Sequence, residues 1–126
     1  MARFGMYPEP HMELEISVHD FDHLKQAAQD AATQQLFLLD VRQPWETELA
    51  AISGGHLIPL EDLPDRAPEE LNPDARIIVY CHHGRRSIPA TLWLREQGFP
   101  HSQSLAGGIE AWSRSIDPSV PEYESP

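Results

Sequence analysis

Residues 76–94 constrain the fold of this chain most strongly, because they combine a strand pattern, a loop and a helix pattern in succession. The run 77–80 is short, apolar and mostly β-branched, which is typical of a parallel strand covered on both faces. From Ile88 onward the apolar residues recur at helical spacing. The loop between the two patterns contains the single cysteine of the chain, Cys81. The stretch predicts an α/β unit with this cysteine at the carboxyl end of a central strand.

Further strand and helix patterns extend this unit to the whole chain. Residues 36–41 are expected to form a buried parallel strand and residues 102–105 the last parallel strand, and helical patterns alternate with them. Shorter strands are expected within 14–18 and 57–60, and Asp20 is expected to cap the first helix. This alternation predicts a small doubly wound α/β sheet, mainly parallel, of about five strands with helices on both faces.

The length of 126 residues fits one domain with a core of its own. We expect a loose N-terminal arm over 1–12, a folded domain over 13–116 and a proline- and acid-rich tail over 117–126. One cysteine excludes an internal disulfide and favours a reducing compartment, so a cytoplasmic location is expected. No apolar run is long enough to span a bilayer, and we expect no signal peptide.

The charge balance limits the partners of the chain. Acidic residues outnumber basic ones by 20 to 9, which gives a formal net charge of −11. Nucleic acids and anionic membranes require basic surfaces, so we expect neither as a partner. Arg85 and Arg86 form the densest basic spot in this acidic background. They predict a site for a small anion.

The loop that follows Cys81 has the composition of an anion cradle, with the sequence His82, His83, Gly84, Arg85, Arg86 and Ser87. A loop between a strand and a helix directs free backbone N–H groups and the positive end of the helix dipole at its occupant. Such surroundings can lower the pKa of a thiol from about 8.5 to roughly 3.5–7.5. A single cysteine after an apolar strand can also be an inert core residue. Two adjacent guanidinium groups favour the nucleophile instead.

The string Cys81-x-x-Gly84-x-Arg86-Ser87 resembles the active-site loop of rhodanese-like sulfurtransferase domains. Three further segments resemble the same family in the expected order: 39–46 (LDVRQPWE), 58–60 (IPL) and 105–112 (LAGGIEAW). Together the motifs extend over about residues 14 to 123. The chain is therefore identified as similar to a single-domain sulfurtransferase of this family. Its ending, 117–123, is similar to that of rhodanese-like domains fused to adenylyltransferases that activate ubiquitin-like sulfur carriers.

This resemblance implies a function and a set of site residues. The Cys81 thiolate is expected to take a sulfane sulfur from a small sulfur-containing anion such as thiosulfate and to hold it as a persulfide. Cyanide, a thiol or a sulfur-carrier protein would then accept the sulfur, with no metal or organic cofactor. Asp40 and Arg42 are expected to lie close to the loop and support it, although Asp40 could equally cap a helix beginning at Pro44. Arg86, which ends the family's loop, is favoured over Arg85 as the ligand of the donor's oxyanion.

Several other functions compete with this interpretation. Cysteine-dependent phosphatases and arsenate reductases of the related fold use a loop one residue longer, whose arginine falls where this chain has Ser87. A thiol–disulfide redox protein needs a second cysteine, which the chain lacks. Zinc binding by Cys81, His82 and His83 requires adjacent residues to share one tetrahedral ion, which is difficult. A non-catalytic binding module of the same family stays open. His56 is a candidate catalytic base, and its role also stays open.

Overall fold

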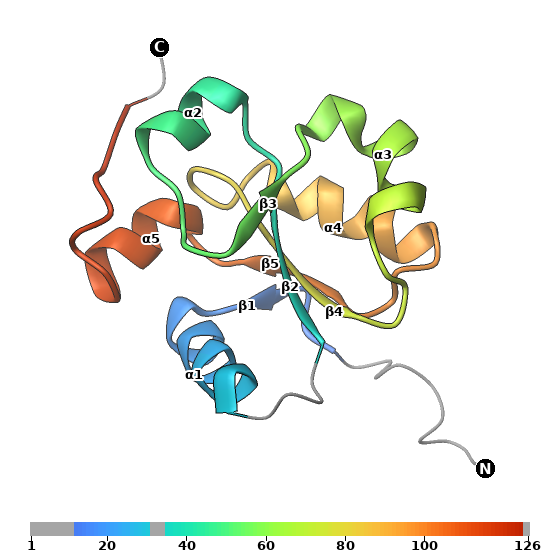
Figure 1. Ribbon diagram of the computed structural model, residues 1–126, viewed down its shortest axis with the longest axis horizontal. Coiled ribbons are helices and arrows are strands. Elements are labelled where there is room, and N and C mark those ends of the chain that lie inside the picture. The colour runs from blue at the N-terminus through green and yellow to red at the C-terminus, as the bar shows by residue number, and fades with distance from the viewer. Residues whose placement is uncertain (1–11, 31–34, 125–126) are drawn as a thin grey trace.

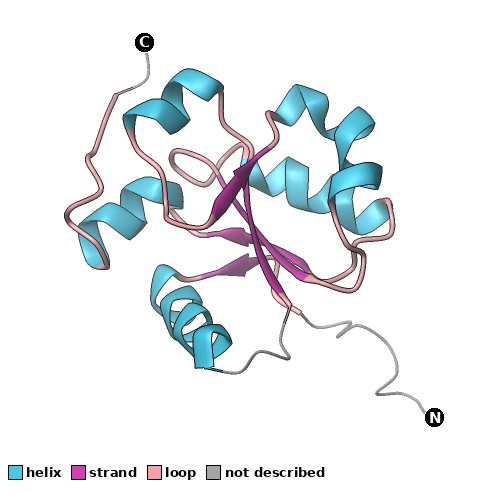
Figure 2. Ribbon diagram, viewed as in Figure 1, coloured by secondary structure: helices cyan, strands magenta, loops and turns pink. Residues whose placement is uncertain are grey.

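The computed structural model describes residues 12–30 and 35–124 of the chain. Five parallel strands form one sheet in the order β1-β5-β4-β2-β3 (Figure 2). Their bounds are β1 (Glu15–Ile16), β2 (Leu36–Asp40), β3 (Gly55–Leu57), β4 (Arg76–Tyr80) and β5 (Ser102–Leu105). The predicted α/β fold is confirmed, with the strand before Cys81 at the centre of the sheet.

Helices cover both faces of this sheet. On one face lie α1 (Val18–Asp30) and α5 (Gly108–Ser115), and on the other lie α3 (Leu63–Glu70) and α4 (Ser87–Glu96) (Figure 1). The short helix α2 (Pro44–Leu49) follows β2, and the 3-10 turn η2 (Leu60–Asp62) follows β3. Within 12–30 and 35–124, none of the helices is both long and apolar enough to cross a lipid bilayer.

The position of β4 at the centre of the sheet, between two cores, explains why its sequence is apolar without alternation. Ile77 and Val79 pack into a core with α3 and α4, whereas Ile78 and Tyr80 pack into a second core with α1 and α5. All four side chains are fully buried. Burying an aliphatic side chain of this size stabilises a fold by about 1.5–3 kcal/mol, so both faces of the strand contribute.

The first edge of the sheet differs from the prediction for residues 14–18. Strand β1 has only two residues, and Val18 already belongs to α1. The Ser17 hydroxyl oxygen accepts the N–H of Asp20 over 3.0 Å, so Ser17 occupies the capping position expected for Asp20. Serine and aspartate are both good caps, and the local pattern could not decide between them.

The other edge was also predicted with the wrong bounds. The strand expected at 57–60 is β3, which ends at Leu57 and pairs only with β2. Pro59 has no backbone N–H to give to a sheet, and the chain turns after it into η2.

The carboxyl ends of β2, β4 and β5 meet at one edge of the sheet. Asp40 is in register with Tyr80, and Val79 is in register with Ser104. The loops that follow these strands therefore lie side by side, and one of them begins with Cys81. This edge is where ligands bind in open α/β sheets.

The C-terminal segment, defined here as residues 117–124, packs against the domain. Val120 is buried in the core beside α5, and the Ser113 hydroxyl donates a hydrogen bond to its carbonyl oxygen. The predicted division at residue 117 stays a prediction, but the described part of the tail is folded onto its neighbours. The predicted N-terminal arm, 1–12, lies outside the described residues except for Met12.

Candidate active site

The thiol of Cys81 lies at the base of the loop and receives two backbone hydrogen bonds. The N–H groups of Gly84 and Ser87 point at its Sγ over 3.2 and 3.4 Å. The Ser87 hydroxyl lies 3.4 Å from Sγ and 2.7 Å from the hydroxyl of Ser104 on β5. Cys81 is 1% exposed. The sulfur is therefore surrounded by donors that stabilise a negative charge on it.

The start of the loop rests on the first turn of α5. The N–H groups of Ile109 and Glu110 donate to the carbonyl oxygens of Cys81 and His82 over 2.9 and 3.1 Å. In a trans peptide C=O and N–H point in opposite directions, so these bonds turn the N–H groups of His82 and His83 away from α5. A Cβ on Gly108 would lie 2.5 Å from both carbonyl oxygens, so this approach requires glycine there.

Arg86 is held by a buried carboxylate from α2. Its two terminal nitrogens donate to Glu46 over 2.7 and 2.8 Å. Glu46 also accepts the N–H of Gln43 and the hydroxyl of Tyr123. Burial opposes the ionisation of Glu46, but the hydrogen bonds from Arg86, Gln43 and Tyr123 outweigh it and lower its pKa to about 2. The group is a carboxylate at neutral pH.

The two arginines of the loop therefore differ in their surroundings. The hydrogen bond to Glu46 raises the pKa of Arg86, and the electrostatic interaction with Cys81 acts in the same direction. Arg85 is exposed and forms no ion pair with any residue that the structure describes. Arg86 thus has a fixed orientation beside the thiol, and Arg85 presents its charge to solvent.

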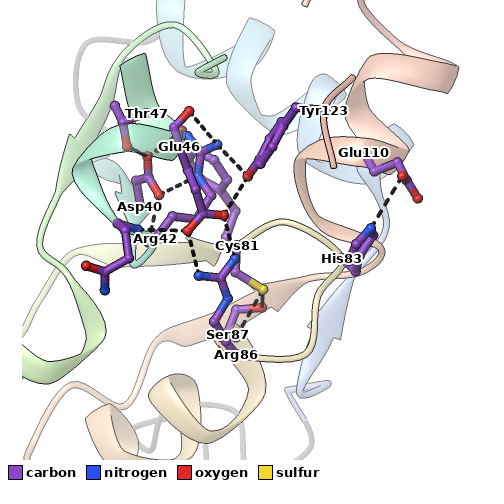
Figure 3. A network of polar contacts seen from close by, with 12 residues as sticks. Asp40, Arg42, Glu46, Thr47, Cys81, His83, Arg86, Ser87, Glu110 and Tyr123 are labelled. Carbon is purple, nitrogen blue, oxygen red and sulfur yellow. Dashed lines mark hydrogen bonds and ion pairs between the residues drawn. The ribbon is translucent and has the colours of Figure 1, made fainter. Parts of the chain in front are cut away.

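Asp40 and Arg42 form a buried pair behind the loop (Figure 3). The guanidinium of Arg42 donates to both carboxylate oxygens of Asp40 over 2.7 and 2.8 Å. Burial disfavours the charge on Arg42, but its hydrogen bond to Asp40 and the negative charge of that residue raise its pKa. Arg42 also donates to the Tyr123 hydroxyl over 3.0 Å, and Tyr123 donates to Glu46. Through this path the pair reaches Arg86 and the loop.

The alternative role of Asp40, as the cap of α2, is not what the structure contains. Gln43 occupies the capping position of α2. The carboxylate of Asp40 instead accepts hydrogen bonds from the side chains of Arg42, Thr47 and Tyr80.

His82 and His83 stack on each other beside Tyr123. The rings of His82 and Tyr123 are 3.9 Å apart and almost parallel, and the two histidine rings are 3.8 Å apart. Burial, followed by the neighbouring His83, lowers the pKa of His82, so a neutral ring is favoured there. His83 is exposed and lies 3.4 Å from a carboxylate oxygen of Glu110.

The two histidines and Glu110 also form the one cluster of metal-ligand types near the loop within the described residues. One ligand atom from each lies within 4.8 Å of the others. The histidine rings are stacked at an angle of only 23°, and imidazole lone pairs lie in the ring plane. Two nearly parallel rings cannot direct these lone pairs at one ion, so the arrangement does not favour a metal. The expected absence of a cofactor stays a prediction.

His56 lies outside this network. Its Nε2 is 2.7 Å from a carboxylate oxygen of Glu70, which also binds Arg66. These contacts join β3 to α3. A role for His56 in chemistry stays open.

Several residues of the network were missing from the site predicted by the sequence. Among them are Glu46, Ser104 and Tyr123. Glu46 lies in a segment that resembles the rhodanese-like family, and this was the one signal for it. Tyr123 lies in the ending with a family resemblance, and Ser104 had no signal beyond its strand.

Comparison with known proteins identifies the family. The sequence model of the Rhodanese-like domain matches residues 20–115. The chain belongs to the rhodanese-like family. A sulfurtransferase of Allochromatium vinosum is 32% identical over 103 residues, which are 82% of this chain and 95% of that protein. A rhodanese-related protein from Thermoplasma volcanium has a similar structure, with a TM-score of 0.69 and 28% identity, over 86% of this chain and 96% of that one.

Other rhodanese-like relatives are longer proteins. The rhodanese-like/PpiC domain-containing protein 12 of Arabidopsis thaliana is 40% identical over 68% of this chain, and the match covers 30% of that protein. The adenylyltransferase and sulfurtransferase MOCS3-1 of Zea mays is 37% identical over 68% of this chain and 20% of its own length. The chain thus spans less than a third of these two relatives. The names of MOCS3-1 and of the Allochromatium vinosum protein both include a sulfurtransferase.

Proposed function

We propose that this chain transfers a sulfane sulfur from an anionic donor such as thiosulfate to a thiophilic acceptor, through a persulfide on Cys81. The observation that carries the proposal is the pair of backbone N–H groups, from Gly84 and Ser87, that point at Sγ. These donors stabilise a thiolate on Cys81, which is the form that attacks the donor. Relatives named sulfurtransferases support the same reaction.

The proposed reaction is a double displacement. The Cys81 thiolate attacks the outer sulfur of thiosulfate and forms an S–S bond, while the S–S bond of the donor breaks and sulfite leaves with its electron pair. The acceptor's nucleophile then attacks the outer sulfur of the persulfide. The second S–S bond breaks and the thiolate is restored. Both half-reactions balance without an oxidant or reductant, and ping-pong kinetics follow.

The two arginines receive different proposed roles. Both terminal nitrogens of Arg86 are engaged by Glu46. Glu46 thus fixes the orientation of Arg86, and in this proposal Arg86 acts by its charge beside the thiol. Arg85 is exposed, and we assign to it the contact with the sulfonate of the donor. The sequence favoured Arg86 for that contact, and its engaged nitrogens are the reason for the different assignment.

For the acceptor, we propose a thiol or a sulfur-carrier protein in a reducing compartment such as the cytoplasm. A relative from Bacillus subtilis that is 39% identical over 80 residues carries the name putative sulfur carrier protein YrkF. A reducing compartment keeps the single thiol available for the reaction.

Intact-mass spectrometry after thiosulfate treatment tests the proposal. The wild type should gain one sulfur atom, about 32 Da, and lose it to cyanide, whereas Cys81→Ser should gain none. If thiosulfate gives no adduct, a protein persulfide is the second donor to test. No adduct from either donor would overturn the proposal. Hydrolysis of an aryl phosphate would then indicate the phosphatase, and its absence would indicate a binding module.

A further inference from the structure

We propose that Tyr123 of the C-terminal segment is a positioning residue for the candidate site. In this proposal its hydroxyl controls how much of the negative charge of Glu46 falls on Arg86, and through Arg86 it controls the reactivity of Cys81. The inference rests on the proposed function in one respect, which is that the Cys81 thiolate is the reacting group.

The hydroxyl of Tyr123 connects two buried charges. It accepts a hydrogen bond from Arg42 over 3.0 Å and donates one to Oε1 of Glu46 over 2.8 Å (Figure 3). Burial, opposed by Arg42 and assisted by Glu46, raises the pKa of Tyr123 to about 12. The phenol therefore keeps its proton across the neutral range, and it is a donor to Glu46 throughout.

The same oxygen of Glu46 that accepts from Tyr123 also accepts from Arg86 over 2.7 Å. Charges of alternating sign thus extend from Asp40 through Arg42 and Glu46 to Arg86. Glu46 and Arg42 are 2% and 0% exposed, so water screens their charges poorly, and the Arg86 side chain is 35% exposed. Without the phenol, the Glu46 carboxylate would interact more strongly with Arg86. Arg86 would then offset less of the charge on the thiolate.

The ring of Tyr123 has a separate role from its hydroxyl. It stacks on His82, and Trp45 contacts it edge-on with ring centroids 6.2 Å apart. The buried Val120 holds the segment on the domain three residues earlier. Tyr123→Phe keeps the ring and its stacking while it removes the hydrogen bonds, so the two roles can be separated by experiment.

The rate of alkylation of Cys81 by iodoacetamide, measured from about pH 5 to about pH 9, tests the proposal because the thiolate is the reacting form. In Tyr123→Phe the profile should move to higher pH by about half a unit, which is about a threefold slower reaction on the rising part of the profile, below its midpoint. Glu122→Gln is the matched control. Glu122 lies in the same segment, is exposed and pairs with Arg114, so its profile should follow the wild type. His82 and His83 are present in every variant, so their contribution is common to the comparison.

A double variant shows whether the hydroxyl acts through Glu46. If it does, Glu46→Gln combined with Tyr123→Phe should have the same profile as Glu46→Gln alone. An unchanged profile in Tyr123→Phe, or two shifts that simply add, would overturn the proposal. Alkylation needs no sulfur donor. A wild type that takes no sulfur from any donor would therefore overturn the proposed function and leave this test of Tyr123 readable.

Discussion

Arg86 donates its two terminal nitrogens to the carboxylate of Glu46, a residue 40 positions earlier in the chain. The arginine that ends the loop motif is therefore committed to a partner inside the protein. Glu46 is 2% exposed, so the pair is fixed at the edge of the sheet beside the thiol. The neighbouring Arg85 is exposed and presents its charge to solvent.

Arg85→Ala should weaken the binding of thiosulfate more than it slows the chemical step. The guanidinium is exposed, and its proposed contact is made to the donor's oxyanion before and during the reaction. We expect KM for thiosulfate to rise about tenfold, with kcat changed by less than about twofold. Steady-state kinetics with cyanide as the acceptor measure both constants. A fall in kcat at constant KM would contradict the assignment and return the contact to Arg86.

Glu46→Gln should lower the free energy of unfolding in a pH-dependent way. The pKa of Glu46 is lowered from 4.5 to about 2 in the folded protein. Its contribution is therefore fully present above about pH 4.5 and is lost as the pH falls towards 2. We expect a loss of about 2 kcal/mol at neutral pH that becomes smaller at about pH 3. Urea unfolding at both pH values measures it, with the exposed Glu122→Gln as control. An equal loss at both values would contradict the prediction.

The sequence predicted the centre of this fold better than its edges. Strand β5 has the predicted bounds, and β2 and β4 differ from their predictions by one residue. Strands β2 and β4 are covered on both faces, so most of their positions are apolar and their pattern is unambiguous. Strand β5 has the sequence SQSL and no such apolar run. The edge strands β1 and β3 have two and three residues. Such short pairings depend on the neighbouring strand and leave little periodicity in the sequence.

The candidate site was predicted where it is local in sequence, or where the family resemblance supplied a residue, as it did for Asp40 and Arg42. Cys81 and its loop form one continuous motif, and its donors Gly84 and Ser87 lie within it. The partners of Arg86 and Arg42 could not be predicted in this way. Glu46 is 40 residues from Arg86, and Tyr123 is 81 residues from Arg42. These contacts exist because the parallel topology brings the ends of β2 and β4 together, and because the C-terminal segment returns to the same edge.

Gly108→Ala should destabilise the protein and disturb the loop. A Cβ there would lie 2.5 Å from the carbonyl oxygens of Cys81 and His82, at a φ of +63°. We expect a loss of about 3 kcal/mol, the sum of backbone strain and overpacking. Gly98→Ala is a matched control, since Gly98 also has a positive φ, +97°, but nothing lies within 4 Å of its Cβ position. Thermal unfolding should show the smaller loss for Gly98→Ala. Equal losses would mean that φ alone, and not the contact with the loop, requires glycine at 108.

Ser104→Ala should make Cys81 less reactive although Ser104 does not touch the sulfur. The Ser104 hydroxyl lies 2.7 Å from that of Ser87, which lies 3.4 Å from Sγ, and both serines are fully buried. When the sulfur is a thiolate, the Ser87 hydroxyl can donate to it while Ser104 donates to Ser87, and such chains strengthen each bond. We expect the alkylation profile of Cys81 to move to higher pH, with the reaction about threefold slower on the rising part of the profile.

Ser102→Ala separates this effect from the general cost of removing a buried hydroxyl on β5. Ser102 is equally buried, and its hydroxyl donates to the carbonyl of Phe99, away from the thiol. Both variants should lower the melting temperature, but only Ser104→Ala should move the alkylation profile. If both move it equally, β5 influences the loop through packing alone. If neither does, the bonds from the backbone of Gly84 and Ser87 hold the thiolate without help from the hydroxyl chain.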